Sequence, residues 1–216
     1  MANTGWDFES NSGAGTSKAE FTKFPQGITN VRLIDPAPYM RWVHWMPQFK
    51  RSVNCPGKGC PICDIRRRQK ANKQEYTYSM SRRLAINVLN RATTNLEIME
   101  QGVNFFNDVK DIMTDINEDG KTLLDVDIKV RRRGTGKDDT SYRVDQGDAY
   151  ELTDDDRIKM DDKIDLAEYF KPHTPEQITR LLNGEKWEDV MSAPKEDSND
   201  IQQDSTDVIG EDIEIR

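Results

Sequence analysis

The sequence has little of several residue types, and each shortage excludes a class of protein. Only 35% of its 216 residues are hydrophobic, and no apolar run approaches the roughly 20 residues that cross a bilayer. The first residues lack the cationic and apolar segments of a secretory signal. With only three cysteines and no sign of an oxidising compartment, we expect reduced thiols or metal ligands, and no membrane partner.

Recognised catalytic motifs are also missing. The chain has no phosphate-cradling glycine loop, no nucleophile elbow and no zinc-protease helix. Acidic residues of the C-terminal half occur in runs such as Asp154–Asp156, a pattern typical of solvated charge rather than of a tuned acid and base. We therefore expect a protein that is not an enzyme.

The charges that are present are distributed unevenly. The net charge is -8, yet residues 41–91 carry 12 Lys and Arg against 2 Asp and Glu, whereas residues 195–216 carry 2 against 8. This polarity predicts a polyanionic partner and an acidic tail. We expect a flexible leader over residues 1–20, one folded domain over 21–190, and a disordered acidic tail over 191–216.

Hydrophobic periodicity predicts a mostly β fold. Alternating segments over 21–35, 76–91 and 123–144 indicate strands, and a helical pattern occupies 102–116. In the third segment Val126, Ile128 and Val130 are expected inside, with Asp127, Lys129 and Arg131 outside. A short helix with a capping box at Thr174 and Gln177 closes the domain. This order favours an OB-like antiparallel barrel with a packed helix and a zinc-binding insertion at 42–70.

The three cysteines lie in one cluster with metal-ligand spacing. Cys55, Cys60 and Cys63 form C-x4-C-x2-C, and His44 precedes them as H-x10-C. Three thiolates and one imidazole suit a closed tetrahedral zinc site, and no His/Glu pair lies nearby to serve a catalytic ion. The cluster predicts a structural zinc. Asp64 and His173 are the alternatives to His44 as fourth ligand.

Cations and aromatic rings are interleaved around this cluster. Cations that follow phosphates and rings that stack on bases are typical of proteins that bind single-stranded nucleic acid. The alternatives are tryptophans in the core and, at residues 66–68, a solvated helix face. The predicted contacts are Arg41, Trp42, Trp45, Lys50, Arg51, Arg66, Arg67, Tyr76, Tyr78, Arg82, Arg83, Arg91, Arg131 and Arg133.

Several phrases in this order resemble a known family. They are FPQGITNVRLID, the H…CPGKGCPIC cluster, RRLAINVLNR, LEIMEQGVNFFNDVK, DVDIKVRRRGTGKDDTSYRV and the acidic end. Together they resemble the single-stranded DNA-binding, helix-destabilising proteins of tailed bacteriophages. The resemblance implies an OB-fold with zinc on His44, Cys55, Cys60 and Cys63, and single-stranded DNA as the partner.

The same resemblance implies a place in phage replication, recombination and repair, in the cytoplasm of an infected bacterial host. The acidic tail would recruit replication proteins such as a polymerase, a helicase or primase, and recombination mediators. One departure is at the N-terminus, where residues 1–20 hold one Lys and no Arg and a well-known member has a basic arm.

Two other functions fit parts of the pattern. A zinc-containing RNA-binding or transcription-regulating protein would have the same cations and rings, and competition between DNA and RNA of equal length would distinguish it. A zinc-dependent nuclease or deaminase would show metal-dependent turnover of single strands, which we do not expect.

Overall fold

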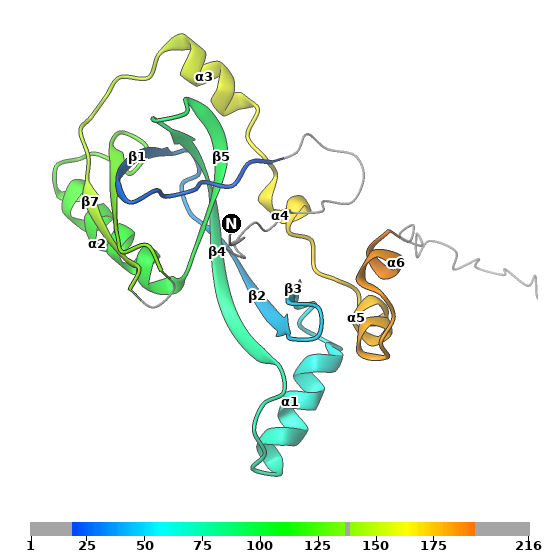
Figure 1. The fold of residues 1–216 in the computed structure, drawn as a ribbon. Coiled ribbons are helices and arrows are strands. Elements are labelled where there is room, and N and C mark those ends of the chain that lie inside the picture. Colours follow the sequence, from blue (N-terminus) through cyan, green and yellow to red (C-terminus); the bar gives the residue numbers. More distant parts are fainter. Residues whose placement is uncertain (1–18, 137–138, 193–216) are drawn as a thin grey trace, which may run out of the picture.

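A computed structural model describes residues 19–136 and 139–192 (Figure 1). The predictions for residues 1–18 and 193–216, which include most of the leader and of the tail, lie outside the described residues. The strands of the described residues are β1 (Gly27–Leu33), β2 (Tyr39–Met46), β3 (Arg51–Asn54), β4 (Ser79–Asn90), β5 (Asn95–Gln101), β6 (Asp127–Arg133) and β7 (Ser141–Gln146). The helices are α1 (Pro61–Ala71), α2 (Val103–Glu118), α3 (Asp154–Asp161), α4 (Leu166–Tyr169), α5 (Pro175–Leu182) and α6 (Trp187–Met191).

The strands form one antiparallel sheet with the order β3-β2-β4-β1-β6-β7, and β5 pairs with β4 outside this path. The long strand β4 serves two regions, because residues 79–85 pair with β2 and residues 84–90 pair with β5. In Figure 1 β4 runs from the upper lobe, which contains α2 and β7, down to α1.

The predicted closure of a barrel is wrong, because the sheet is open. Closure would require the free edge of β5 to pair with another strand of the sheet. The N-terminal segment occupies that edge instead: Ile98 N donates to Glu20 O at 2.8 Å, and Thr22 N donates to Ile98 O at 2.9 Å. Among the described strands, β7 pairs only with β6.

The main core confirms the predicted periodicities. Val31, Ile86 and Val88 are buried on one face of the sheet, and Ile128 and Val130 join them from β6. Helix α2 adds Phe105, Val109, Ile112 and Ile116. The predicted closing helix is α5, where Thr174 and Gln177 form the capping box.

The prediction that Asp127 faces outward, made from the alternation of residues 126–131, needs one correction. It lies on the outer face of β6, as expected, but it is fully buried. Its carboxylate accepts from Arg32 Nε at 2.6 Å and from Arg91 Nε at 3.0 Å. The segment after β7 covers this face, since Arg32 also donates to Tyr150 O at 2.7 Å. Outward-facing charges are therefore buried where the chain returns over the sheet.

A second core lies at the other end of β4. Residues of β2, β3 and α1 pack there against the two C-terminal helices, and the buried members are Met46, Val53, Cys60, Ile62, Ile178, Leu181 and Val190. Figure 1 shows α5 and α6 beside β3 and α1. We call this region the metal lobe. None of the described helices is both long enough and apolar enough to cross a bilayer.

Candidate metal centre and basic-aromatic face

The four predicted metal ligands come together in the metal lobe. His44 lies on β2, Cys55 follows β3, Cys60 caps α1 and Cys63 lies in its first turn. Their ligand atoms all lie within 4.8 Å of one another. His44 Nε2 is 3.5 Å from Cys60 Sγ and 3.4 Å from Cys63 Sγ. One ion can therefore contact all four side chains after small adjustments.

The local sequence explains how the cysteines converge. Gly57 and Gly59 both have φ of 77°, a left-handed conformation that favours glycine and turns the loop back on itself. Pro61 then starts α1 with a preset φ. The backbone at Cys55 is held by a hydrogen bond from its N to Trp42 O at 2.8 Å.

The electrostatics of the cluster favour a cation. Burial lowers the pKa of His44, so its imidazole is neutral and can donate a lone pair. Burial, together with the neighbouring Cys55 thiol, raises the pKa of the Cys63 thiol to about 12. Thiols in this position keep their protons unless a positive charge stabilises the thiolates, which a bound metal ion does. The cluster could therefore bind a metal ion.

The two alternative ligands have other partners. His173 Nδ1 accepts from Asn54 N at 2.9 Å, and its ring lies beside Trp187. Asp64 accepts from Arg67 Nη1 at 2.9 Å on the exposed side of α1. Within the part of the chain that the structure describes, neither residue belongs to the group, so the geometry favours His44.

An exposed stretch of sheet lies between the metal lobe and the main core. Trp42 is opposite Arg82, and Met40 is opposite Leu84, in the β2–β4 register. Trp42 is 44% exposed and Met40 is 51% exposed. On the same face, His44 is buried on the metal-lobe side and Ile86 on the main-core side. We call Met40, Trp42, Arg82 and Leu84 the β2–β4 floor.

The floor combines an exposed ring with an unpaired cation. The Arg82 guanidinium lies 5.9 Å from the centroid of the Trp42 ring and has no ion-pair partner among the residues that the structure describes. Trp42 is thus exposed, although a tryptophan on a strand often belongs to the core. The floor presents one stacking surface and one positive charge side by side.

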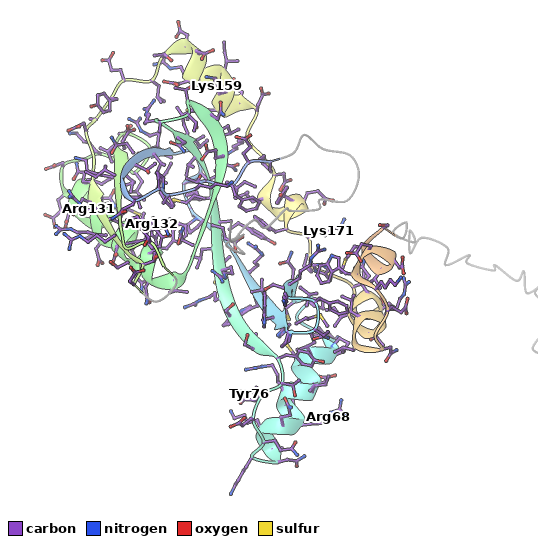
Figure 2. All side chains as sticks on the ribbon, viewed as in Figure 1. Arg68, Tyr76, Arg131, Arg132, Lys159 and Lys171 are labelled. Carbon is purple, nitrogen blue, oxygen red and sulfur yellow. The ribbon has the colours of Figure 1, made fainter. Side chains whose placement is uncertain are left out.

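Other predicted contacts surround the metal lobe. Tyr76 is 48% exposed, and Arg66 packs on its ring at 3.9 Å while donating to Tyr78 O. Tyr78 itself packs into the metal-lobe core. Figure 2 shows Tyr76 with Arg68 at the end of the molecule formed by α1.

The remaining predicted contacts of β2 and β3 lie near the hairpin that joins them. Trp45, 37% exposed, alternates with His44 along β2 and therefore lies on the opposite face of the strand. Lys50 is exposed in the turn. The Arg51 guanidinium has two partners: its Nη1 lies 3.9 Å from Glu188 Oε1, and its Cζ lies 5.3 Å from the centroid of the Trp187 ring. Arg67 is exposed and pairs with Asp64. The structure thus places these cations on more than one side of the lobe.

Arg41, Arg83 and Arg91 are further predicted contacts with partners inside the protein. Arg41 donates to Asn54 and Glu100, and it packs on Phe170 at 3.5 Å. Arg91 donates to Asp127 and Asp156. Arg83 lies 3.9 Å from Glu100. The guanidinium groups of Arg41 and Arg91 therefore hold the fold together, and no local sequence signal shows this because their acidic partners are far along the chain.

Arg131 and Arg133 lie together on the outer face of β6. The residue between them, Arg132, points the other way and donates to Phe24 O at 2.8 Å.

Sequence reasoning missed several neighbours that the register brings to these surfaces. They are Met40 and Leu84 on the floor, and Ile28, Lys129 and Arg143 beside Arg131. Two-residue spacing from predicted contacts could have found Met40, Leu84 and Lys129, whereas Ile28 and Arg143 are brought beside Arg131 by the strand register.

Comparison with known proteins gives one relevant similarity. No protein-family model and no solved structure matches the chain. The chain is 26% identical over 167 residues to a probable ssDNA-binding protein of Escherichia phage T5. The match covers 69% of this chain and 62% of that protein, so the chain spans less than two thirds of the relative's length.

Proposed function

We propose that the chain binds single-stranded DNA with little sequence preference and catalyses no reaction. The observation that carries this proposal is the β2–β4 floor, where Trp42 and Arg82 lie exposed on adjacent strands. A flat ring can stack on any base, and a guanidinium beside it can neutralise a phosphate. The similarity to a probable ssDNA-binding protein supports the same function.

We further propose that the metal is zinc and that it is structural. His44, Cys55, Cys60 and Cys63 supply one nitrogen and three sulfur ligands, the donor set of closed tetrahedral zinc sites. With four protein ligands the ion has no open position for a substrate. Bound zinc would hold β2, β3 and α1 together and so position the strand that carries Trp42.

The strand order supports an OB-like domain without a closed barrel. Five strands, β5-β4-β1-β6-β7, are consecutive neighbours, and α2 connects β5 to β6. OB-folds are partly open five-stranded structures that bind oligonucleotides. We infer that residues 21–190 are one such domain, extended by the zinc-binding insertion at 42–70 and by the C-terminal helices.

The wider role that we propose is coating of single strands in phage replication, recombination and repair, in the cytoplasm of an infected bacterial host. The acidic end, with 8 acidic and 2 basic residues over 195–216, would recruit replication proteins such as a polymerase, a helicase or primase, and recombination mediators. Charge and similarity support this role.

Replacing Trp42 tests the proposal. Trp42→Ala should weaken binding to labelled oligo-dT by about 1–3 kcal/mol, measured by fluorescence anisotropy, because one stacking surface is lost. Its salt dependence should stay nearly unchanged, whereas Arg82→Gln should reduce the slope by roughly 0.7 for one lost phosphate contact. Tyr150→Ala is the matched control, since that ring is 54% exposed outside the floor.

Two results would contradict the proposal. One is equal affinity for duplex and single-stranded DNA, and the other is an equal loss of affinity in Trp42→Ala and Tyr150→Ala. Competition with RNA of equal length decides between this proposal and the RNA-binding alternative, because RNA that displaced the DNA at lower concentration would favour the alternative.

A further inference from the structure

The outer face of strands β1, β6 and β7 carries a second group of cations. Ile28 is opposite Arg131 in the β1–β6 register, and Arg131 is opposite Arg143 in the β6–β7 register. Lys129 and Arg133 lie two residues to either side of Arg131 and therefore share its face. We call Ile28, Lys129, Arg131, Arg133 and Arg143 the outer hairpin face.

Most of the charge on this face is not neutralised. One acid shares this face: Asp145 is opposite Lys129 in the β6–β7 register, and Arg143 Nε pairs with its carboxylate at 2.9 Å. No ion-pair partner is found for Lys129, Arg131 or Arg133 among the described residues. Like charges directly opposite one another destabilise a pair of strands. Arg131 and Arg143 are directly opposite one another, so an anion bound between them would replace their repulsion with attraction.

The outer hairpin face is separate from the β2–β4 floor. Val130 and Arg132 alternate with the cations and face the other way, Val130 into the main core and Arg132 towards Phe24 O. Figure 2 places Arg131 and Arg132 in the lobe of α2 and β7, whereas the floor lies on β2 and β4, on the face of the sheet that carries His44 and Ile86. A short ligand on the floor would therefore leave this face free.

We propose that the outer hairpin face is a second contact site for the backbone of the same DNA strand, which it engages after the strand leaves the floor. This inference rests on the proposed function. The occupant is a phosphodiester backbone, because the face offers three guanidinium groups and one ammonium group against the carboxylate of Asp145. Ile28 is its one large exposed apolar side chain among the described residues. Contacts here are to phosphates, and they discriminate strands by length rather than by base.

The test compares a triple variant with a charge-matched control on two lengths of oligo-dT. The variant is Arg131→Gln, Arg133→Gln and Arg143→Gln. The control is Lys110→Gln, Lys121→Gln and Lys186→Gln, which removes three positive charges at exposed positions elsewhere. The lengths are about 6 and about 16 nucleotides, both within the range of about 4–16 nucleotides found for OB-fold sites.

For the long strand the variant should bind about tenfold or more weakly at low salt, and its salt slope should fall by about 2, for three lost phosphate contacts. Its affinity for the short strand should equal that of the unmodified protein, and the control should match the unmodified protein on both lengths. An unchanged long-strand affinity, or an equal loss on both lengths, overturns the inference. Loss of binding in Trp42→Ala is a separate readout that tests the floor alone.

Discussion

At the scale of single residues, Asp127 is the strongest example of charge used to hold the fold. It is 0% exposed and accepts hydrogen bonds from two guanidinium groups, those of Arg32 and Arg91. Arg32 is itself only 2% exposed. A buried ion pair of this kind contributes little net stability over an apolar pair, but removing one partner leaves an uncompensated charge inside.

We therefore expect Asp127→Asn to lower the free energy of unfolding by about 3–5 kcal/mol, because Arg32 remains buried without a countercharge. Denaturant unfolding followed by circular dichroism measures this. Asp145→Asn is the control: it breaks an exposed ion pair with Arg143, which is worth about 0–1 kcal/mol. Equal effects of the two substitutions would show that the buried network is not important for stability.

At the scale of secondary-structure elements, the metal centre and the C-terminal helices belong to one packing unit. Ile178 and Leu181 of α5 and Val190 of α6 are buried against residues of β2, β3 and α1. Asn54 and His173 form two hydrogen bonds: Asn54 N donates to the His173 side chain at Nδ1, at 2.9 Å, and His173 N donates to Asn54 O at 3.2 Å. Residues 173–191 therefore depend on the loop that carries the cysteines.

Metal removal should thus loosen α5 and α6 but not α2. Hydrogen exchange with and without a chelator measures this, with residues 175–191 as the reporter and 103–118 as the internal reference. The reason is that binding of a structural metal is coupled to folding of the region around it. Cys60→Ser should lose the metal and show the same change together with a lower Tm. Unchanged exchange at 175–191 in metal-free protein would contradict this coupling.

At the scale of the whole molecule, charge is separated along the chain. Residues 41–91 hold 12 basic and 2 acidic residues, and residues 195–216 hold 2 basic and 8 acidic ones. A polyanion tethered to the same chain has a high effective concentration near the chain's own cations. We propose that residues 195–216 compete in this way with DNA for the cations of residues 41–91, and salt would screen both contacts.

Removing residues 194–216 should therefore tighten binding to oligo-dT at low salt, and the gain should shrink as salt rises. Fluorescence anisotropy across a salt series measures this. The control keeps the full length but replaces the eight acidic residues of 195–216 by their amides, and it should behave like the truncation. A gain that appears only in the truncated chain would show that bulk rather than charge is responsible.

The sequence by itself determined those strands and helices in which buried residues recur at a regular spacing. Alternation identified β1, β4 and β6, and a helical period identified α2, because each element buries one side against the same core. The spacing of Cys55, Cys60 and Cys63 likewise predicted their convergence, since a glycine-rich turn and the start of a helix bring together residues that are close along the chain.

Only the tertiary structure decided the features that depend on distant segments. The sheet stays open because Glu20 and Thr22 take the edge of β5, which no period in the sequence reveals. Asp127 is buried and Trp42 exposed because of what covers each face: the segment after β7 covers the first, and no described segment buries the second. Periodicity reports which face a residue is on, whereas burial depends on which remote part of the chain packs against that face.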